Sequence, residues 1–219
     1  MSERRWSEID REIARLFASD PEADAAIAAS EAAGLPAIEL APPHAKFLML
    51  LALVGRARRV LEIGTLGGYS TIWMARALPA DGHLISLEAS NRHAEVARAN
   101  VERANLSHLV EVRVGKALDL LPVIAEEGGG PFDLVFIDAD KDNNAAYLDW
   151  AIKMSRRGTA IVVDNVVRYG AQDTTARGTE VRGFMELLAR EPRVSATAIQ
   201  TVSIKGHDGF ALAVVTAEE

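Results

Sequence analysis

The chain has 219 residues, enough for one domain with a full-sized core, and it is 49% hydrophobic and 25% charged, as globular proteins usually are. Its formal net charge is -7 and it has no block of Lys and Arg, which argues against a nucleic-acid binder. Because it contains no cysteine, a disulfide or a thiolate metal site is excluded, and metal ligands must be oxygen or imidazole. No apolar run could span a bilayer, and the first residues lack the apolar core of a secretory signal, so we expect a cytoplasmic protein with a small-molecule partner and no membrane contact.

The first 57 residues are predicted to be helical. A helical pattern runs from residue 6 to residue 33, with a break at Asp20-Pro21 and an end at Gly34. A third helix follows over residues 45–55, opened by two prolines. The apolar residues at helical spacing are Ile9, Ile13, Leu16 and Phe17 in the first helix and Phe47, Leu48, Leu51 and Leu53 in the third. We expect these helices to cover a site or to form a subunit contact.

Short apolar runs then alternate with helical segments. The predicted strands are 59–63, 84–87, 110–114, 134–137 and 159–163, and the predicted helices are 70–77, 92–104, 118–124, 144–154 and 180–189. Residues 196–204 and 210–215 indicate a terminal β-hairpin. Five strand–helix alternations predict an α/β fold with a mostly parallel sheet and helices on both faces, to which the hairpin adds an antiparallel edge. We expect one domain, residues 1–219, with a helical segment (1–57) and a core (58–219).

A glycine-rich turn follows the first predicted strand, in the segment VLEIGTLGGYS at residues 60–70. Glycines let the backbone pass close to a ligand, and ligands of open α/β sheets bind at the carboxyl ends of the strands. The dinucleotide pattern G-x-G-x-x-G is missing, because Gly64 is followed by Thr65-Leu66-Gly67. The turn therefore indicates a nucleotide-like cofactor other than a dinucleotide.

Two acids support a cationic cofactor. Glu62, near the end of the first strand, suits the amino group or the sulfonium region of S-adenosylmethionine better than a phosphate. Glu88 ends the next strand, where an acid can accept both ribose hydroxyls. Ser70 either caps the following helix or contacts the cofactor, and these interpretations are compatible.

Two further acids and an amide are predicted to converge on one point. Asp138 ends the fourth strand, and Asp164 and Asn165 end the fifth. Adjacent strands lie about 4.8 Å apart, so the three side chains can form a hard oxygen site. Such a site suits Mg²⁺, with Mn²⁺ or Ca²⁺ as alternatives. Each acid alone would be read as a loop cap or a turn residue.

Lys141 lies three residues after Asp138. A lysine beside a bound dication loses its proton more readily, which makes Lys141 a candidate general base rather than an ordinary surface lysine. The five histidines, His44, His83, His93, His108 and His207, show no metal spacing. We interpret them as structural or solvated, with His44 the only one near the proposed site.

The sequence resembles the cation-dependent O-methyltransferase family of catechol and caffeoyl-coenzyme A O-methyltransferases. The resemblance runs from about residue 40 to the C-terminus and is carried by VLEIGTLGGYS (60–70), DLVFIDADK (133–141) and VDNV (163–166). The chain differs from the family at Ala45-Lys46-Phe47, where many members have Gly-Gln-Phe. The acid that holds the second hydroxyl in catechol-specific animal enzymes has no match.

The resemblance implies a Rossmann-like class I methyltransferase fold with a seven-stranded sheet whose last strand is antiparallel. It implies that S-adenosylmethionine is bound by Leu40, Glu62, Gly64, Thr65, Ser70, Glu88, Ala117 and Asp138. It also implies that Asp138, Asp164 and Asn165 bind the divalent cation and that Asp138 and Lys141 act in catalysis. Asp140 matches a position near the substrate, and the loop from Arg168 to residue 177 is expected to face it. By analogy we expect a homodimer.

These residues predict methyl transfer to a phenolic hydroxyl of a catechol-type acceptor. The metal binds two neighbouring phenolic oxygens, Lys141 removes one proton, and the phenolate attacks the sulfonium methyl. Two other classes remain open, a nicotinamide-dependent oxidoreductase on a Rossmann-like sheet and a non-catalytic methyltransferase-like binding module. The missing G-x-G-x-x-G argues against the first, and the complete set of ligands with Lys141 argues against the second.

Overall fold

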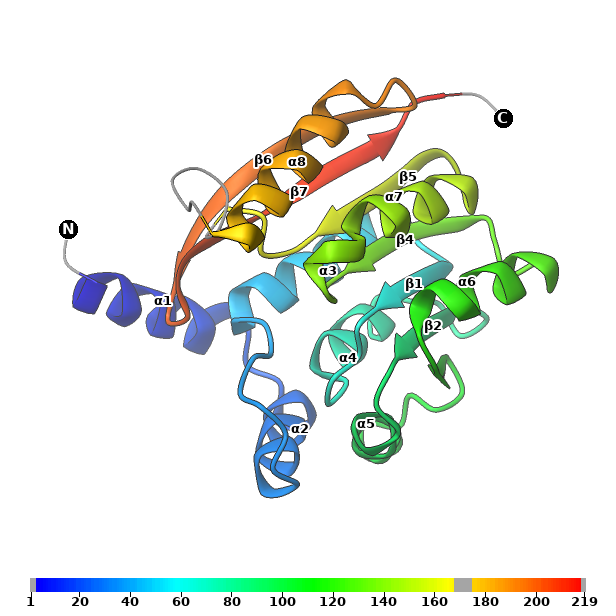
Figure 1. Cartoon of the computed structure of the whole chain (residues 1–219). Helices are drawn as coiled ribbons and strands as arrows, with labels where there is room; N and C mark the ends of the chain where they lie inside the picture. The colour runs from blue at the N-terminus through cyan, green and yellow to red at the C-terminus, as the bar shows by residue number, and fades with distance from the viewer. Residues whose placement is uncertain (1–2, 168–174, 218–219) are drawn as a thin grey trace.

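The structure, a computed structural model, describes residues 3–167 and 175–217 (Figure 1). Within these residues the strands are β1 (Arg59–Ile63), β2 (His83–Glu88), β3 (Val110–Val114), β4 (Phe132–Ile137), β5 (Ser155–Val163), β6 (Val194–Ser203) and β7 (Gly206–Val215). They form a seven-stranded sheet in the order β3-β2-β1-β4-β5-β7-β6. Strands β1 to β5 are parallel, and β7 lies antiparallel between β5 and β6. The predicted α/β fold with an antiparallel C-terminal hairpin is confirmed.

Helices cover both faces of this sheet. They are α1 (Glu3–Phe17), α2 (Pro21–Ala32), α3 (Pro42–Val54), α4 (Tyr69–Ala75), α5 (Asn91–Arg103), α6 (Ala117–Glu126), α7 (Asn144–Lys153) and α8 (Ala176–Arg190), with a short 3₁₀ turn η1 (Lys141–Asn143). The predicted break at Asp20-Pro21 is the start of α2, where Pro21 takes the first helical position. The Asp20 carboxylate accepts hydrogen bonds from the backbone N–H groups of Glu22 and Ala23, which caps the helix.

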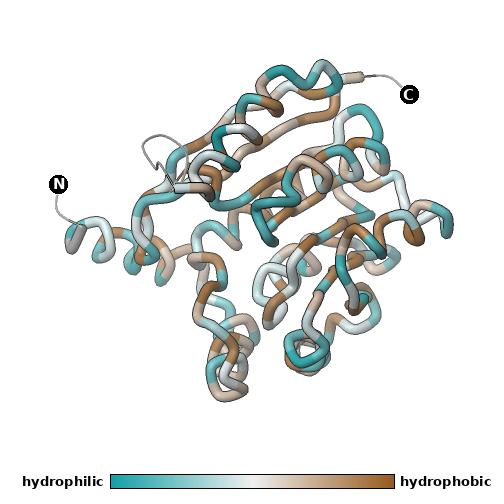
Figure 2. The backbone as a smooth tube through the Cα atoms, in the orientation of Figure 1, coloured by the Kyte–Doolittle hydropathy of each residue, from teal (hydrophilic) through white to brown (hydrophobic). Residues whose placement is uncertain are grey.

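The sheet separates two apolar cores. Helices α2 to α5 pack on one face and α6 to α8 on the other, and successive residues of β1 alternate between the two. Val60 belongs to the first core, and Leu61 and Ile63 belong to the second. The central strands are hydrophobic along most of their length, whereas the helices alternate between hydrophobic and hydrophilic segments (Figure 2). No helix in the described part of the chain is both long enough and apolar enough to cross a membrane.

Two details of the sequence prediction are wrong. Leu48 of α3 is fully buried, but Leu53, expected on the same apolar face, is 46% exposed because it turns away from the sheet. The last strand, expected over residues 210–215, begins at Gly206, since Ser203 pairs with Gly206 and the hairpin turns in two residues. Helix α1 lies beside the tip of this hairpin (Figure 1), where the Asp10 carboxylate accepts a hydrogen bond from the backbone of Ile204.

Helix α3 offers a matched test of this packing. We expect Leu48→Ala to lower the free energy of unfolding by about 2–5 kcal/mol, because it leaves a cavity in the core. Leu53→Ala, the same change on the exposed side of the helix, should change it by only about 0.5 kcal/mol. Urea unfolding followed by circular dichroism measures both. Equal losses in the two variants would mean that α3 packs differently.

Candidate active site

The strand order reverses at β1 and β4, and a cavity opens at their carboxyl ends. Strand β1 is followed outward by β2 and β3 on one side, while β4 and β5 lie on the other. Such a switch point leaves a crevice above the sheet because successive connections leave it in opposite directions. The cavity there has a volume of about 1230 Å³. It is lined by the glycine turn and by the ends of β2, β4, β5 and β7.

Two glycines fix the path of the turn after β1. Gly64 has φ +98°, and a Cβ built on it would lie 2.1 Å from the backbone oxygen of Asp138, so only glycine lets the ends of β1 and β4 approach this closely. Gly68 has φ +82° and precedes α4. The turn therefore lines the cavity with backbone atoms, which a ligand can approach closely.

Glu62 lies behind this turn rather than along the cavity. Its carboxylate is fully buried and accepts hydrogen bonds from the hydroxyls of Ser70 and Thr71 at 2.5 Å and of Ser86 at 2.6 Å. Burial raises the pKa of Glu62 to about 7, although the three hydroxyls oppose that rise. Glu62 is not among the residues that line the cavity, so a direct cofactor contact stays a prediction. Its observed partners anchor α4 to the sheet.

The other residues assigned to the cofactor do line the cavity. Glu88 holds the turn, because one carboxylate oxygen accepts hydrogen bonds from the backbone N–H groups of Thr65 at 3.2 Å and of Leu66 at 2.8 Å. The other oxygen accepts from the backbone N–H of Ser90 at 2.9 Å and lies 3.4 Å from Nδ1 of His93. A carboxylate has about four acceptor positions, so at most one stays open for a ligand hydroxyl. The remaining members of this set along the cavity wall are Leu40, Gly64, Ser70, Ala117 and Asp138.

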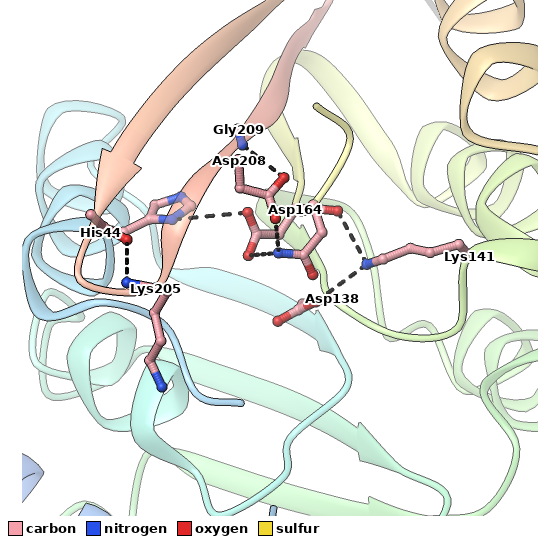
Figure 3. Close-up of polar contacts among 9 residues, drawn as sticks. His44, Asp138, Lys141, Asp164, Lys205, Asp208 and Gly209 are labelled. Carbon is pink, nitrogen blue, oxygen red and sulfur yellow. Dashed lines mark hydrogen bonds and ion pairs between the residues drawn. The ribbon is translucent and has the colours of Figure 1, made fainter. Parts of the chain in front are cut away.

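The three predicted metal ligands line the cavity at the ends of β4 and β5. Figure 3 shows Asp138 and Asp164 there. Asp164 is 4% exposed, and burial, followed by the negative charge of Asp138, raises its pKa well above its usual range. The amide Nδ2 of Asn165 donates to Oδ2 of Asp164 at 3.1 Å. Among residues 3–167 and 175–217, no group of three His, Cys, Asp or Glu side chains is placed to hold a metal ion, and the set of Asp138, Asp164 and Asn165 stays a prediction.

Lys141 lies between the two acids. Its side chain is 6% exposed, and Nζ donates to Oδ1 of Asp138 at 3.3 Å and to the backbone oxygen of Asp164 at 3.1 Å. The amine therefore faces the same cavity as the glycine turn. It is held in a geometry from which it can exchange a proton with a bound molecule.

A third acid of this cluster, Asp208, was missed in the sequence. It lies near the start of β7, its Oδ2 accepts from Asn165 at 3.4 Å, and its Oδ1 accepts from the backbone of Gly209 at 2.9 Å (Figure 3). Because β7 is antiparallel, its first residues lie at the edge where the parallel strands end. A polar residue at the start of an antiparallel strand was the signal that could have identified it.

The residues assigned to the substrate are placed only in part. Asp140 lines the cavity and accepts a hydrogen bond from the hydroxyl of Tyr147 at 2.6 Å, a partner that the sequence did not suggest. Burial, together with the negative charge of Asp140, raises the pKa of Tyr147. Arg168 and the loop up to residue 174 lie outside the described residues.

His44 also belongs to the cavity wall. It stands in the first turn of α3, and its ring centroid lies 4.8 Å from that of Phe210 and 6.5 Å from that of Phe47. Its Nδ1 lies 3.9 Å from Oδ1 of Asp164. Burial lowers the pKa of His44, although the nearby Asp138 and Asp208 oppose this.

Comparison with known proteins identifies the family. A family model described as O-methyltransferase matches residues 25–214. A catechol O-methyltransferase of Mycobacterium tuberculosis is 55% identical over 203 residues, 91% of each chain, and one of Niastella koreensis is 47% identical over 222 residues, 98% of this chain and 100% of the other. An O-methyltransferase of Bacillus cereus solved in complex with SAH has a TM-score of 0.94 and 51% identity, with 98% of this chain and 100% of that chain covered.

The match to the family model extends from α2 to β7 and includes every residue assigned to the cavity except those of α1. Both relatives are named as O-methyltransferases, and this chain aligns with nearly their whole length. The solved structure has the same fold. The chain therefore belongs to the O-methyltransferase family, and it is an enzyme with the S-adenosylmethionine-dependent class I fold.

Proposed function

We propose that this enzyme transfers the methyl group of S-adenosylmethionine to a phenolic hydroxyl of a catechol-type acceptor and that it needs a divalent cation, most simply Mg²⁺. The observation that carries this proposal is the meeting of Asp138, Asp164 and Asn165 beside Lys141, in the cavity that the glycine turn also lines. The names of the M. tuberculosis and N. koreensis relatives support a catechol acceptor.

The residues at the ends of β4 and β5 fit a hard dication. Two carboxylates and an amide supply oxygen ligands, which Mg²⁺, Mn²⁺ and Ca²⁺ prefer. Asp164 is buried beside the charge of Asp138, and such a pair is costly without a compensating cation. Lys141 supplies only one positive charge to this cluster, which also includes Asp208. A dication would complete the neutralisation.

One set of residues in the cavity is assigned to the methyl donor, and a second set is assigned to the dication. We assign the donor to Leu40, Gly64, Thr65, Ser70, Glu88 and Ala117, with Glu62 supporting Ser70 from behind. A sulfonium donor supplies an activated methyl group, and a dication held by Asp138, Asp164 and Asn165 would make the phenolic proton easier to remove.

The remaining task is proton removal and alignment. As a neutral amine, Nζ of Lys141 takes the phenolic proton and becomes an ammonium group, and Asp138 and the backbone of Asp164 hold that nitrogen in place. Phe47 and Phe210 provide apolar surface for an aromatic ring on the other side of the acids. Asp140 and Arg168 are assigned to acceptor contacts. Holding two reactants in line is worth about 7–11 kcal/mol of the barrier.

We also propose that two copies associate through α1. Ile9, Ile13, Leu16 and Phe17 are between 40% and 68% exposed, which is unusual for a row of apolar residues on one helix. A second copy would bury them. A cytoplasmic location stays a prediction.

Sedimentation tests the association. We expect the wild type to sediment as a dimer and Leu16→Glu/Phe17→Glu to sediment as a monomer, because buried charges would oppose the contact. Val54→Glu, which places a charge at another exposed apolar position, is the control and should stay dimeric. A monomeric wild type would contradict the proposal.

The metal requirement has two direct tests. Excess EDTA should abolish methylation of a catechol and added Mg²⁺ should restore it. Asp138→Ala should lower kcat/KM by about a hundredfold or more, because a metal supplies several kcal/mol and each 1.4 kcal/mol is about tenfold. Asp142→Ala, which removes an exposed acid nearby, should leave the rate unchanged. Full turnover in EDTA would disprove the metal requirement.

The role of Lys141 as general base is tested by replacing it with methionine, an uncharged side chain of similar length. We expect Lys141→Met to lower kcat by about a hundredfold or more, the usual contribution of a general base, while SAH binds as tightly as before. Lys153→Met, on the exposed side of α7, is the control. Rates are measured by product formation and SAH affinity by calorimetry. An unchanged kcat in Lys141→Met would remove the assignment.

A further inference from the structure

We propose that His44 is a positioning residue that acts through Asp164: its Nδ1–H group donates to Oδ1 of the carboxylate and holds it in the orientation that binds the dication. This inference rests on the proposed function, because it assigns a role toward the same metal. It gives a task to a histidine that the sequence marked only as structural or solvated. Figure 3 shows the ring and the carboxylate facing each other across the edge of the sheet.

The backbone and two aromatic rings fix the position of His44. The residue follows two prolines at the start of α3, and its backbone N–H donates to the oxygen of Ala41 at 2.9 Å. Phe210 and Phe47 pack against the imidazole, whose side chain is only 13% exposed. The ring therefore has little freedom to turn away from Asp164.

The surroundings of the ring place its proton on Nδ1. A neutral imidazole carries one N–H group and one acceptor nitrogen. Nε2 of His44 is buried and has no hydrogen-bond partner among the residues that the structure describes. Burying an N–H group without an acceptor is costly, whereas Nδ1 faces a carboxylate oxygen. The tautomer protonated at Nδ1 follows.

Asp164 needs such a donor. Its Oδ2 accepts from Asn165, and its Oδ1 faces His44. The side chain is about 5% exposed, so bulk water does not orient it. The present separation of 3.9 Å exceeds a hydrogen bond, and a shift of about 1 Å closes it. Groups behind metal-ligating carboxylates usually make this kind of contact, and losing one typically costs 10–100-fold in metal affinity.

A purely structural role makes a different prediction. If the ring only fills the space between Phe47 and Phe210, then phenylalanine at position 44 should serve equally well. Asparagine distinguishes donation to Asp164 from space filling. Its amide nitrogen takes the position of Nδ1 and can donate, whereas its smaller side chain fills the space less well. Glutamine places its amide nitrogen nearer the position of Nε2, away from Asp164.

The experiment is a titration of the full-length protein with Mn²⁺, in which free Mn²⁺ is followed by electron paramagnetic resonance. We expect His44→Phe and His44→Gln to weaken Mn²⁺ binding by about tenfold or more and His44→Asn to stay within about threefold of the wild type. SAH affinity should be equal in all four proteins, which reports an intact fold. His108→Phe, the same change at an exposed histidine outside the cavity, is the control and should bind Mn²⁺ like the wild type.

Two results would overturn the inference: Mn²⁺ affinity in His44→Phe equal to that of the wild type, or equally weak binding in His44→Asn and His44→Phe. Asp164→Ala sets the level for a lost site. A wild type that binds Mn²⁺ no better than Asp164→Ala would instead contradict the metal requirement of the proposed function. The two failures are therefore distinguishable.

Discussion

The carboxylates of Asp138 and Asp164 lie at the ends of adjacent strands, and the site depends on how their mutual repulsion is compensated. Asp164 is almost completely buried, close enough to Asp138 for that charge to raise its pKa, and Asp208 adds a third acid from β7. Burying like charges is costly unless a cation compensates for them. A lysine ammonium group compensates in part, and in the proposed function a dication would replace this compensation, so that Lys141 acts as the neutral amine that accepts a proton.

The sheet order makes this arrangement unavoidable. Because β4 lies between β1 and β5, the glycine turn after β1 and the acids after β4 and β5 open onto one cavity. At Gly64 the ends of β1 and β4 lie so close that no side chain fits between this residue and the backbone of Asp138. A donor on the turn and an acceptor on the acids would thus lie side by side without any large movement. The antiparallel β7 then contributes Asp208 and Phe210 from the opposite chain direction.

Much of this could be predicted from the sequence, for identifiable reasons. Strand ends are marked by a change from apolar to polar residues, so Glu88, Asp138 and Asp164 were placed correctly along the cavity. Periodicity could not show that Glu62 faces three hydroxyls behind the turn, because both faces of a central strand are buried. Asp208 was missed, and His44 was expected near the site but without a partner, since their proximity to Asp164 depends on tertiary packing rather than on spacing.

The central claim is that a dication, the acceptor and Lys141 meet at the ends of β4 and β5. A crystal structure of the enzyme with Mg²⁺, SAH and a catechol tests it most directly. The account predicts one Mg²⁺ bound by Asp138, Asp164 and Asn165 and by both catechol oxygens, with Nζ of Lys141 within about 3 Å of one of these oxygens. A catechol bound elsewhere in the cavity, or a metal held by other residues, would contradict it.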